Sequence, residues 1–433
     1  MVDFNWLMLL FLFFYIAQTA FRIWVERINI IHSEKYSDRV PLGFEDFIDG
    51  AKLKKISAYT RETSRIGILR EVAENTVLLA ILLSGFLPML VSLFERGHLS
   101  LIPAGLLFFF IPGAIQFLVE IPFGYYNTFV IEEKFGFNKS TLRLWILDLV
   151  KAGLVEIVLF SLLFSALLLI ISDFPRFWWF WGFLVVITVQ LIMAVLYPVL
   201  IAPLFNRFEA VKDEELARKI TILMADNGIR VKRILQMDAG LRSSHTNAYF
   251  TGFGKTKQIV LYDTLLESHT HDEILSVLAH EAGHFRKKHI LKQFIIFACF
   301  SLVAFYVTYL FIQWPLLYET FGFAAPIPYV GLFLAGVFGQ KAAFFLQPLY
   351  MEVSRRFERE ADLFSLNMLK TPKPMLEALK RLAADNLSNL NPHPVYVWFH
   401  YSHPPIVERV AELEEAGNSF GDTQSAYLEK SGR

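Results

Sequence analysis

The residues from His280 to His284 read His-Glu-Ala-Gly-His and fit the pattern H-E-x-x-H. The surrounding stretch, HDEILSVLAHEAGHFRKKH, has helical apolar spacing, acidic residues at its start and basic residues at its end. On a helix, residues four positions apart share a face, so both imidazoles can bind one metal ion. Glu281 is close enough to take a proton from metal-bound water, whose pKa zinc lowers to about 7. The spacing therefore predicts a hydrolytic zinc site. A chain of this length and histidine content would contain a random match to this pattern with a probability of about one in a hundred. The alternative, that both histidines are merely structural, is therefore disfavoured.

A third metal ligand is needed, because a catalytic zinc usually has three protein ligands and one open position. His271 and His289 lie at the ends of the same expected helix and are poor candidates. The stretch SRRFEREADLFSL offers Glu358 and Asp362, four residues apart on one helical face. We expect Glu358 to bind the metal and Asp362 to support a ligand histidine, whereas Glu360 should face elsewhere. Taken alone, this stretch also fits a solvated charged helix.

The composition indicates a membrane protein. The chain has 433 residues, of which 55% are hydrophobic and 19% charged, against about 45–50% and about 25% in soluble domains. The net charge of zero gives no indication of nucleic-acid binding. The single cysteine, Cys299, cannot form an intramolecular disulfide, and we expect it to be a small buried apolar residue.

Seven segments are long and apolar enough to cross a hydrocarbon core, which takes about 20 residues. The links after the first and third spans carry thirteen Lys and Arg, and those after the second and fourth carry two. The positive-inside rule therefore places the C-terminus in the cytoplasm. The seven expected spans are Phe4–Trp24, Val77–Phe94, Leu101–Phe123, Gly153–Ser172, Phe177–Leu204, Phe294–Trp314 and Pro326–Tyr350.

These spans divide the chain into four parts. Residues 1–205 hold spans one to five with their cytoplasmic links, and residues 294–350 hold spans six and seven. Residues 206–293 form a metalloprotease segment with the HEAGH helix, and residues 351–433 form a cytoplasmic segment that completes the zinc site. Because both polar segments adjoin spans, the metal should lie at or just below the membrane surface. That position suits membrane-anchored or lipidated substrates.

The segment 206–293 should begin as a helix over Asp213–Ile229, followed by three short strands, VKRILQMD, TNAYFTG and KQIVLYD, the last two forming a hairpin. The hairpin turn GFGKT partly fits a phosphate-binding loop. However, that motif needs glycine where the chain has Tyr249, and it should lead into a helix rather than a strand. We therefore expect no nucleotide site.

The motifs HEAGH, FEREAD, SHTNAYF and YSHPPIVER, together with seven spans, resemble the type I CAAX prenyl endopeptidases. These are integral-membrane gluzincin zinc proteases that process isoprenylated proteins. The resemblance covers nearly the whole chain. It implies a mostly α fold, in which a seven-transmembrane helical barrel encloses a water-filled chamber and a zincin-like α+β metalloprotease domain lies on the cytoplasmic side.

The resemblance also implies roles for individual residues. One Zn²⁺ would be bound by His280, His284 and Glu358. Asn247, with Ala248 and Tyr249, would hold the substrate backbone, and His403 and Arg409 would support the reacting carbonyl. Thr246 stands where many relatives have serine. Polar residues within the spans agree with a wet interior, although paired structural charges are an alternative: Gln116, Glu120, Glu156, Gln190, Gln340 and Lys341.

Three functions remain open from the sequence. The first, and the leading one, is a zinc endopeptidase that cleaves near the C-terminus of prenylated or membrane-associated proteins, with Glu281 as its catalytic base. The second is a quality-control protease of the same clan, although such relatives generally have fewer spans. The third is a transporter or receptor with a structural zinc, which would normally have four protein ligands. The partners expected are a peptide or protein substrate and the bilayer, with no nucleic acid or nucleotide. The membrane would be the inner or plasma membrane of a bacterium, or the endoplasmic reticulum of a eukaryote.

Overall fold

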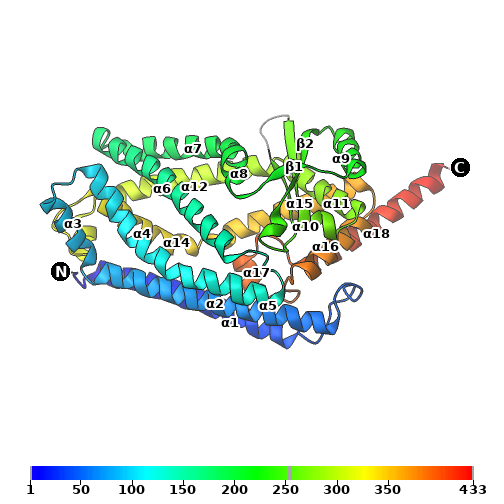
Figure 1. Ribbon diagram of the computed structural model, residues 1–433, viewed down its shortest axis with the longest axis horizontal. Coiled ribbons are helices and arrows are strands. Elements are labelled where there is room, and N and C mark those ends of the chain that lie inside the picture. Colours follow the sequence, from blue (N-terminus) through cyan, green and yellow to red (C-terminus); the bar gives the residue numbers. More distant parts are fainter. Residues whose placement is uncertain (1, 252–255, 432–433) are drawn as a thin grey trace.

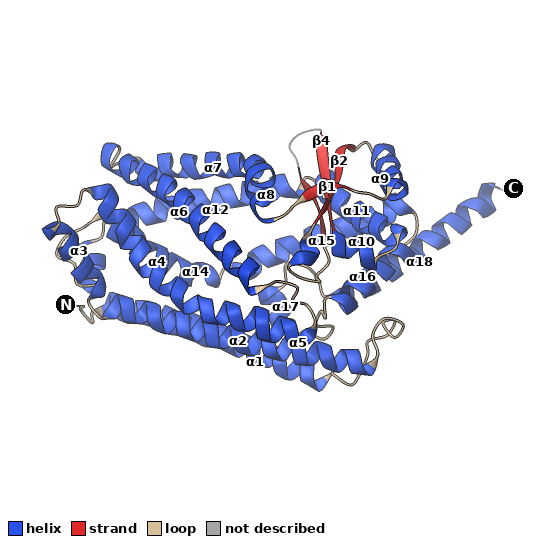
Figure 2. Ribbon diagram, viewed as in Figure 1, coloured by secondary structure: helices blue, strands red, loops and turns tan. Residues whose placement is uncertain are grey.

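The computed structural model describes residues 2–251 and 256–431 of the chain. The molecule is elongated and mostly helical, with long helices along most of its length and a small sheet near one end (Figures 1 and 2). The N-terminus lies at the end of the molecule opposite the sheet, and the last helix projects beyond the sheet (Figure 1).

Within the described residues, five helical stretches are long and apolar enough to cross a membrane. Two further helix pairs pass the same test together but are bent, so the number of candidate spans is five, or up to seven if each bent pair counts as one. The five are α1 (Trp6–Lys35), α4 to α5 (Leu101–Phe135), α6 (Leu142–Asp173), α7 to α8 (Trp178–Phe205) and α12 (His289–Phe311).

The bent pairs correspond to the second and seventh predicted spans, which are not single straight helices. The predicted span Val77–Phe94 straddles a bend of 54° between α2 (Gly50–Leu83) and α3 (Phe86–Arg96), where Gly85 has a φ of +80°. The predicted span Pro326–Tyr350 contains a bend of 56° between α14 (Pro328–Phe344) and α15 (Gln347–Leu369). Helical apolar spacing continues through such a bend, so the sequence pattern does not reveal it.

Several of these helices also extend beyond the predicted spans. The 30 residues of α1 are about 45 Å long, against a hydrocarbon core of about 30 Å.

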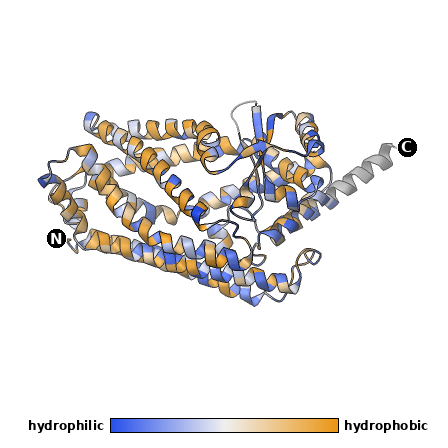
Figure 3. Cartoon of the chain, viewed as in Figure 1, coloured by the Kyte–Doolittle hydropathy of each residue, from blue (hydrophilic) through white to orange (hydrophobic). Residues whose placement is uncertain are grey.

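Apolar residues predominate along α4, α6, α7 and α12, and hydrophilic residues are more frequent around the sheet (Figure 3). The apolar windows of α7 and α12 bury none of their residues within the protein. For the same reason Cys299 of α12 is exposed rather than buried, so that prediction was wrong.

A cavity of about 1210 Å³ lies among α1, α2, α4, α6 and α14. Five of the six intramembrane polar residues predicted to face a wet interior line it, and Gln190 is not among its lining residues; the five are Gln116, Glu120, Glu156, Gln340 and Lys341. Lys341 is buried, and its Nζ donates to Gln18 Oε1 at 3.0 Å and to Asn75 Oδ1 at 2.7 Å. Its ammonium group is therefore hydrogen-bonded to two side-chain amide oxygens.

The sheet has four strands in the order β1-β2-β4-β3: Phe208–Ala210, Arg230–Met237, Thr256–Tyr262 and Ala248–Thr251. β2 and β4 are parallel, and β3 pairs antiparallel with β4, as the predicted hairpin requires. Most of the GFGKT turn lies outside the described residues, but a strand follows it. In the described part of the sheet β3 pairs only with β4, so β3 is an edge strand.

The helix predicted over Asp213–Ile229 is α9 (Glu214–Asp226), and Asp213 caps it. A buried apolar cluster joins α9 and the sheet to α11 (His271–Arg286). The helix α11 also packs against α15 and α16 (Lys373–Asp385). Segments that lie before and after α12 and α14 in the sequence are thereby brought together at the metal motif.

Candidate active site

The metal-motif helix α11 starts at a capping box. Thr270 Oγ1 accepts from the backbone N–H of Glu273, and the Glu273 carboxylate accepts from the backbone N–H of Thr270. Arg381 of α16 donates to Glu273 Oε1 at 2.9 Å. Burial would raise the pKa of Glu273, but its bonds to Thr270 and Arg381 lower it overall. The start of α11 is therefore fixed to its neighbours.

Helices α11 and α15 cross closely at Gly283. A Cβ added at Gly283 would lie 2.9 Å from Ala361 Cα and 3.1 Å from Ala361 O. Ala361 lies between Glu358 and Asp362 in the sequence. The glycine inside the HEAGH motif therefore lets the two helices approach until both carboxylates reach the histidines.

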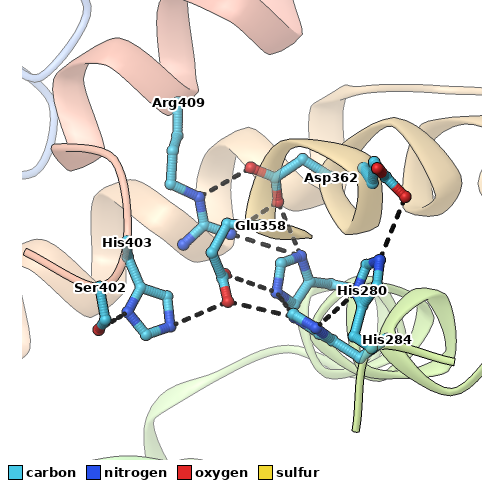
Figure 4. A network of polar contacts seen from close by, with 9 residues as sticks. His280, His284, Glu358, Asp362, Ser402, His403 and Arg409 are labelled. Carbon is cyan, nitrogen blue, oxygen red and sulfur yellow. Dashed lines mark hydrogen bonds and ion pairs between the residues drawn. The ribbon is translucent and has the colours of Figure 1, made fainter. Parts of the chain in front are cut away.

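A group that could hold a metal ion consists of His280, His284 and Glu358, with one possible ligand atom from each lying within 4.8 Å of the others. We call these three residues the metal-ligand group. Glu358 Oε2 is 3.2 Å from His280 Nε2, and Glu358 Oε1 is 3.3 Å from His284 Nε2 (Figure 4). The two Nε2 atoms are 3.1 Å apart. Apart from the ion-pair contact with His280, the buried Glu358 Oε2 has no hydrogen-bond partner among the described residues. Converging imidazole and carboxylate atoms with an unsatisfied oxygen fit the donor set that zinc prefers.

The electrostatics of this group favour a positive charge. Burial alone would lower the pKa of His280, yet its hydrogen bonds with Asp362 and Glu358 raise that pKa to about 9. Burial would raise the pKa of Glu358, but the two histidines hold it well below its usual range. The Glu358 carboxylate therefore remains ionised at neutral pH and attracts a cation.

His280 is oriented by a second pair of residues. Its Nδ1 is 2.7 Å from Asp362 Oδ1. The guanidinium of Arg409 donates to both oxygens of Asp362, from Nε at 2.8 Å and from Nη2 at 2.6 Å (Figure 4). Despite burial, Arg409 and His280 lower the pKa of Asp362 to about 2. Arg409, in the first turn of α18 (Ile406–Ser431), thus contacts the carboxylate that orients His280.

His284 is oriented by a residue that sequence reasoning set aside. His289 is 1% exposed and stacks on Phe357 with ring centroids 4.3 Å apart. Its Nδ1 is 3.0 Å from His284 Nδ1, and its Nε2 is 3.2 Å from Glu360 Oε2. Lys288, with a φ of +58°, separates α11 from α12 and turns His289 back. Glu360 faces away from the metal-ligand group, as predicted, and contacts this second histidine.

Glu281 and His403 border the metal-ligand group. Burial raises the pKa of Glu281, although His280 and His284 oppose the shift. His403 lies between α17 (Pro394–His400) and α18, and its Nε2 is 3.3 Å from Glu358 Oε1. Ser402 Oγ is 2.8 Å from His403 Nδ1. A hydroxyl that donates to Nδ1 leaves the imidazole proton on Nε2, which faces the ligand group. The signal for Ser402 was its place beside His403 in YSHPPIVER.

The three residues expected to hold substrate lie on or beside β3, which packs against α11. Asn247 precedes the strand, its carbonyl accepts from the Tyr262 N–H, and its Oδ1 accepts from the Ala248 N–H at 2.8 Å. Ala248 is buried, and burial raises the pKa of Tyr249 to about 12. The polar network in Figure 4 joins the other predicted site residues, apart from Glu281, and does not include these three.

Comparison with known proteins agrees with this geometry. Residues 29–207 match the family described as CAAX prenyl protease N-terminal, five membrane helices. Residues 210–417, which contain the whole site, match peptidase family M48. The chain belongs to peptidase family M48. Because both regions are matched, the chain is a membrane metalloendopeptidase of the CAAX prenyl protease 1 type.

Individual relatives extend the match over most of the chain. A CAAX prenyl protease 1 homolog of Oryza sativa subsp. japonica is 38% identical over 69% of this chain and 70% of the relative. CAAX prenyl protease 1 of Saccharomyces cerevisiae is 34% identical over 93% of this chain and 94% of its own. The crystal structure of S. mikatae Ste24p superposes with a TM-score of 0.87 at 30% identity, covering 94% of this chain and 98% of that one.

These matches indicate the class of enzyme and its metal. M48 proteases are zinc-dependent in general, and the chain has a His-His-Glu group that could hold the metal. As a member of this family with several candidate membrane helices, the protein is a multi-pass integral membrane protease that acts on peptides or proteins.

Proposed function

We propose that the protein is a zinc-dependent endopeptidase that hydrolyses peptide bonds near the C-terminus of prenylated or membrane-associated proteins. The observation that carries this proposal is the convergence of His280, His284 and Glu358 on one point, with Glu281 beside them. Three protein ligands leave a tetrahedral zinc with one open position, which hydrolysis requires. A structural zinc site has four protein ligands and therefore no open position. We assign one zinc ion to each chain.

Zinc at this site would supply a water acidic enough to lose a proton at neutral pH and would polarise the scissile carbonyl. Glu281 takes the proton of the attacking water and later delivers it to the leaving amine. The buried surroundings that raise the pKa of Glu281 suit a group that must both accept and release a proton. Asp362, held by Arg409, fixes the ring of His280 with Nε2 toward the ligand group.

We assign His403 to the developing oxyanion. We assign the Ser402 hydroxyl as the donor to His403 Nδ1, which places the imidazole proton on Nε2, so that the neutral imidazole can donate to the oxygen that gains charge. The resemblance implies that Arg409 supports the reacting carbonyl. Because Arg409 donates to Asp362 with two nitrogens, its contacts favour an indirect role, in which it holds the carboxylate that orients His280.

The edge of β3 is the proposed binding place for the peptide. An extended peptide that adds to an exposed strand edge is held by main-chain hydrogen bonds, so its backbone matters more than its sequence. Asn247, Ala248 and Tyr249 border this edge, and β3 packs against α11. A peptide added there lies beside the helix that carries Glu281.

The wider architecture is also proposed. The candidate spans would form a seven-span barrel around the cavity, with residues 206–293 and 351–433 forming a zincin-like domain. The thirteen-to-two distribution of basic residues supports a cytoplasmic site. In a eukaryote the membrane would be the endoplasmic reticulum, and in a bacterium the inner or plasma membrane. We expect no binding of nucleic acid or nucleotide.

A direct test uses purified protein in liposomes with matched farnesylated and unmodified peptides. We expect cleavage near the C-terminus that a chelator abolishes and zinc restores, with the farnesylated peptide preferred. Absence of cleavage in protein that contains stoichiometric zinc would refute the proposed activity. Equal cleavage of both peptides would refute the preference for prenylated substrates alone.

A further inference from the structure

The chain from Arg242 to Thr246 leads directly into β3 and is attached to elements outside the sheet. Arg242 donates to both oxygens of Asp148 in α6, from Nε at 2.7 Å and from Nη2 at 3.2 Å. The N–H of Ser244 donates to the carbonyl of Phe137 at 3.0 Å, and Ser243 pairs with Asn138 in an isolated β-bridge. The entry to β3 is thereby fixed to the segment that joins the α4–α5 stretch to α6.

His245 makes the central contacts of this attachment. Its ring stacks on Phe137 with centroids 4.2 Å apart and an interplanar angle of 21°. Its Nε2 is 3.5 Å from Glu132 Oε2, and the other oxygen of Glu132 accepts from the hydroxyl of Tyr59 at 2.7 Å. Glu132 lies near the end of the α4–α5 stretch, and Tyr59 lies in α2. One side of His245 therefore contacts the α4–α5 stretch directly and reaches α2 through Glu132.

The other side of His245 contacts the helices around the metal site. Its Nδ1 is 2.8 Å from Asn386 Oδ1, which also accepts from the N–H of Thr246 at 3.3 Å. Asn386 is the C-terminal cap of α16, and α16 packs against α11. The same helix α16 carries Arg381, which holds the capping box of α11. A single imidazole thus links α2 and the α4–α5 stretch to a direct neighbour of the metal-motif helix.

This link matters because β3 has four residues and one described neighbour in the sheet. A short edge strand has few ladder bonds of its own to fix its position, and a loosely placed strand must be ordered when peptide binds. We propose that His245, held between Glu132 and Asn386, is a positioning residue that sets the placement of the peptide-binding strand β3. The inference rests on the proposed function, because it assumes that peptide binds at β3.

The contact with Glu132 adds a dependence on pH. Glu132, and through it Tyr59, are the titratable groups whose described contacts reach His245. The hydrogen bond with Glu132 raises the pKa of His245 above its ordinary value of 6.5, although burial opposes the shift. The ion pair is therefore fully formed below pH 6.5 and weakens as the pH rises through the raised pKa. Peptide affinity should weaken over the same range.

The test compares KM, kcat and zinc content of the full-length enzyme in liposomes, using one farnesylated peptide. Loss of a hydrogen bond to a charged group corresponds to about tenfold in an equilibrium, so His245→Ala and Glu132→Gln should each raise KM by about tenfold. We expect kcat to change less than about twofold, because the metal-ligand group is untouched. The double variant should raise KM no more than His245→Ala alone, since both changes break one link.

The matched control is His271→Ala, which breaks another His–carboxylate pair, with Asp213 at 2.8 Å, that includes no residue of β3 or of its entry. It should leave KM unchanged. Between pH 6 and 8 the rise in KM should be steeper for the wild type than for Glu132→Gln. If His245→Ala gives no folded protein, Glu132→Gln and Tyr59→Phe carry the same test.

Unchanged KM in Glu132→Gln, or equal KM changes in His271→Ala, would overturn the inference while leaving the proposed protease activity intact. Parallel pH profiles in the wild type and Glu132→Gln would also overturn it. A wild type that binds zinc but cleaves no peptide would instead refute the proposed function.

Discussion

Gly283 of α11 lies so close to α15 that a Cβ at this position would be 2.9 Å from Ala361 Cα. Because the contact is with backbone, a side chain here must push the helices apart and move Glu358 and Asp362 away from the histidines. We expect Gly283→Ala to cost about 1–3 kcal/mol of stability and to weaken zinc binding, as measured by thermal unfolding and chelator competition. The control is Gly336→Ala in α14, where an added Cβ meets nothing within 4 Å. Equal effects in both variants would contradict this account.

Glu281→Gln should abolish peptide hydrolysis and leave zinc bound. Loss of the general base typically costs about 10²–10⁴-fold in rate, whereas the three ligand side chains remain. The measurements are peptide turnover and metal analysis of the same preparation. A variant without stoichiometric zinc would show that Glu281 has another role.

Glu358→Ala should lose both metal and activity, because it removes one of three ligands. Glu360→Ala keeps all three but releases His289 from its carboxylate, so we expect zinc to be retained with an affinity lowered by about tenfold. His289→Ala should give a similar loss, and the spectrum of the cobalt-substituted enzyme should change in both.

The control for Glu360 is Glu352→Ala, on the same helix, whose carboxylate contacts Arg355 and Arg356 instead. Metal affinities that are equal in Glu360→Ala and the wild type would remove Glu360 and His289 from the support of His284.

His403→Ala should lower kcat by about 10²–10³ with little change in KM and with zinc retained. A donor to the oxyanion acts mainly in the transition state, whereas Asn247→Ala should chiefly raise KM because it weakens backbone binding. Steady-state kinetics at fixed zinc would distinguish the two. Turnover by His403→Ala at the wild-type rate would rule out the oxyanion role.

Cysteines at Leu99 and Ala411 should react with a membrane-impermeant reagent from opposite sides of the bilayer. Both positions are exposed, and the distribution of basic residues puts the first outside and the second in the cytoplasm. The background should be Cys299→Ser, because Cys299 is exposed. Labelling from one side only would overturn the proposed topology.

Local patterns predicted the parts of the site that depend on one helix. The spacing of His280 and His284 and that of Glu358 and Asp362 follow from the helical repeat, which the structure retains at both places. His289 was set aside because it lies at an end of the helix expected to carry the motif. In the structure the chain breaks at Lys288, and His289 beyond the break contacts His284; no motif marks this break.

Contacts between distant segments were not accessible from the sequence in the same way. The carboxylate of Glu132 reaches His245 only because the α4–α5 stretch ends beside the entry to β3. The bend at Gly85 was also missed, since apolar residues continue on both sides of it. In each case the deciding information is the relative placement of elements that share no short-range sequence pattern.

The separation of His284 from Glu358 by α12 and α14 has a consequence for biosynthesis. A chain emerging from the ribosome contains the two histidines proposed as zinc ligands long before Glu358 is made. The full donor set exists only after the helices between them have been synthesised and α15 has docked on α11. A growing chain would therefore have no peptidase activity while its own membrane helices are still being inserted. A product truncated before Glu358 would not cleave other membrane proteins.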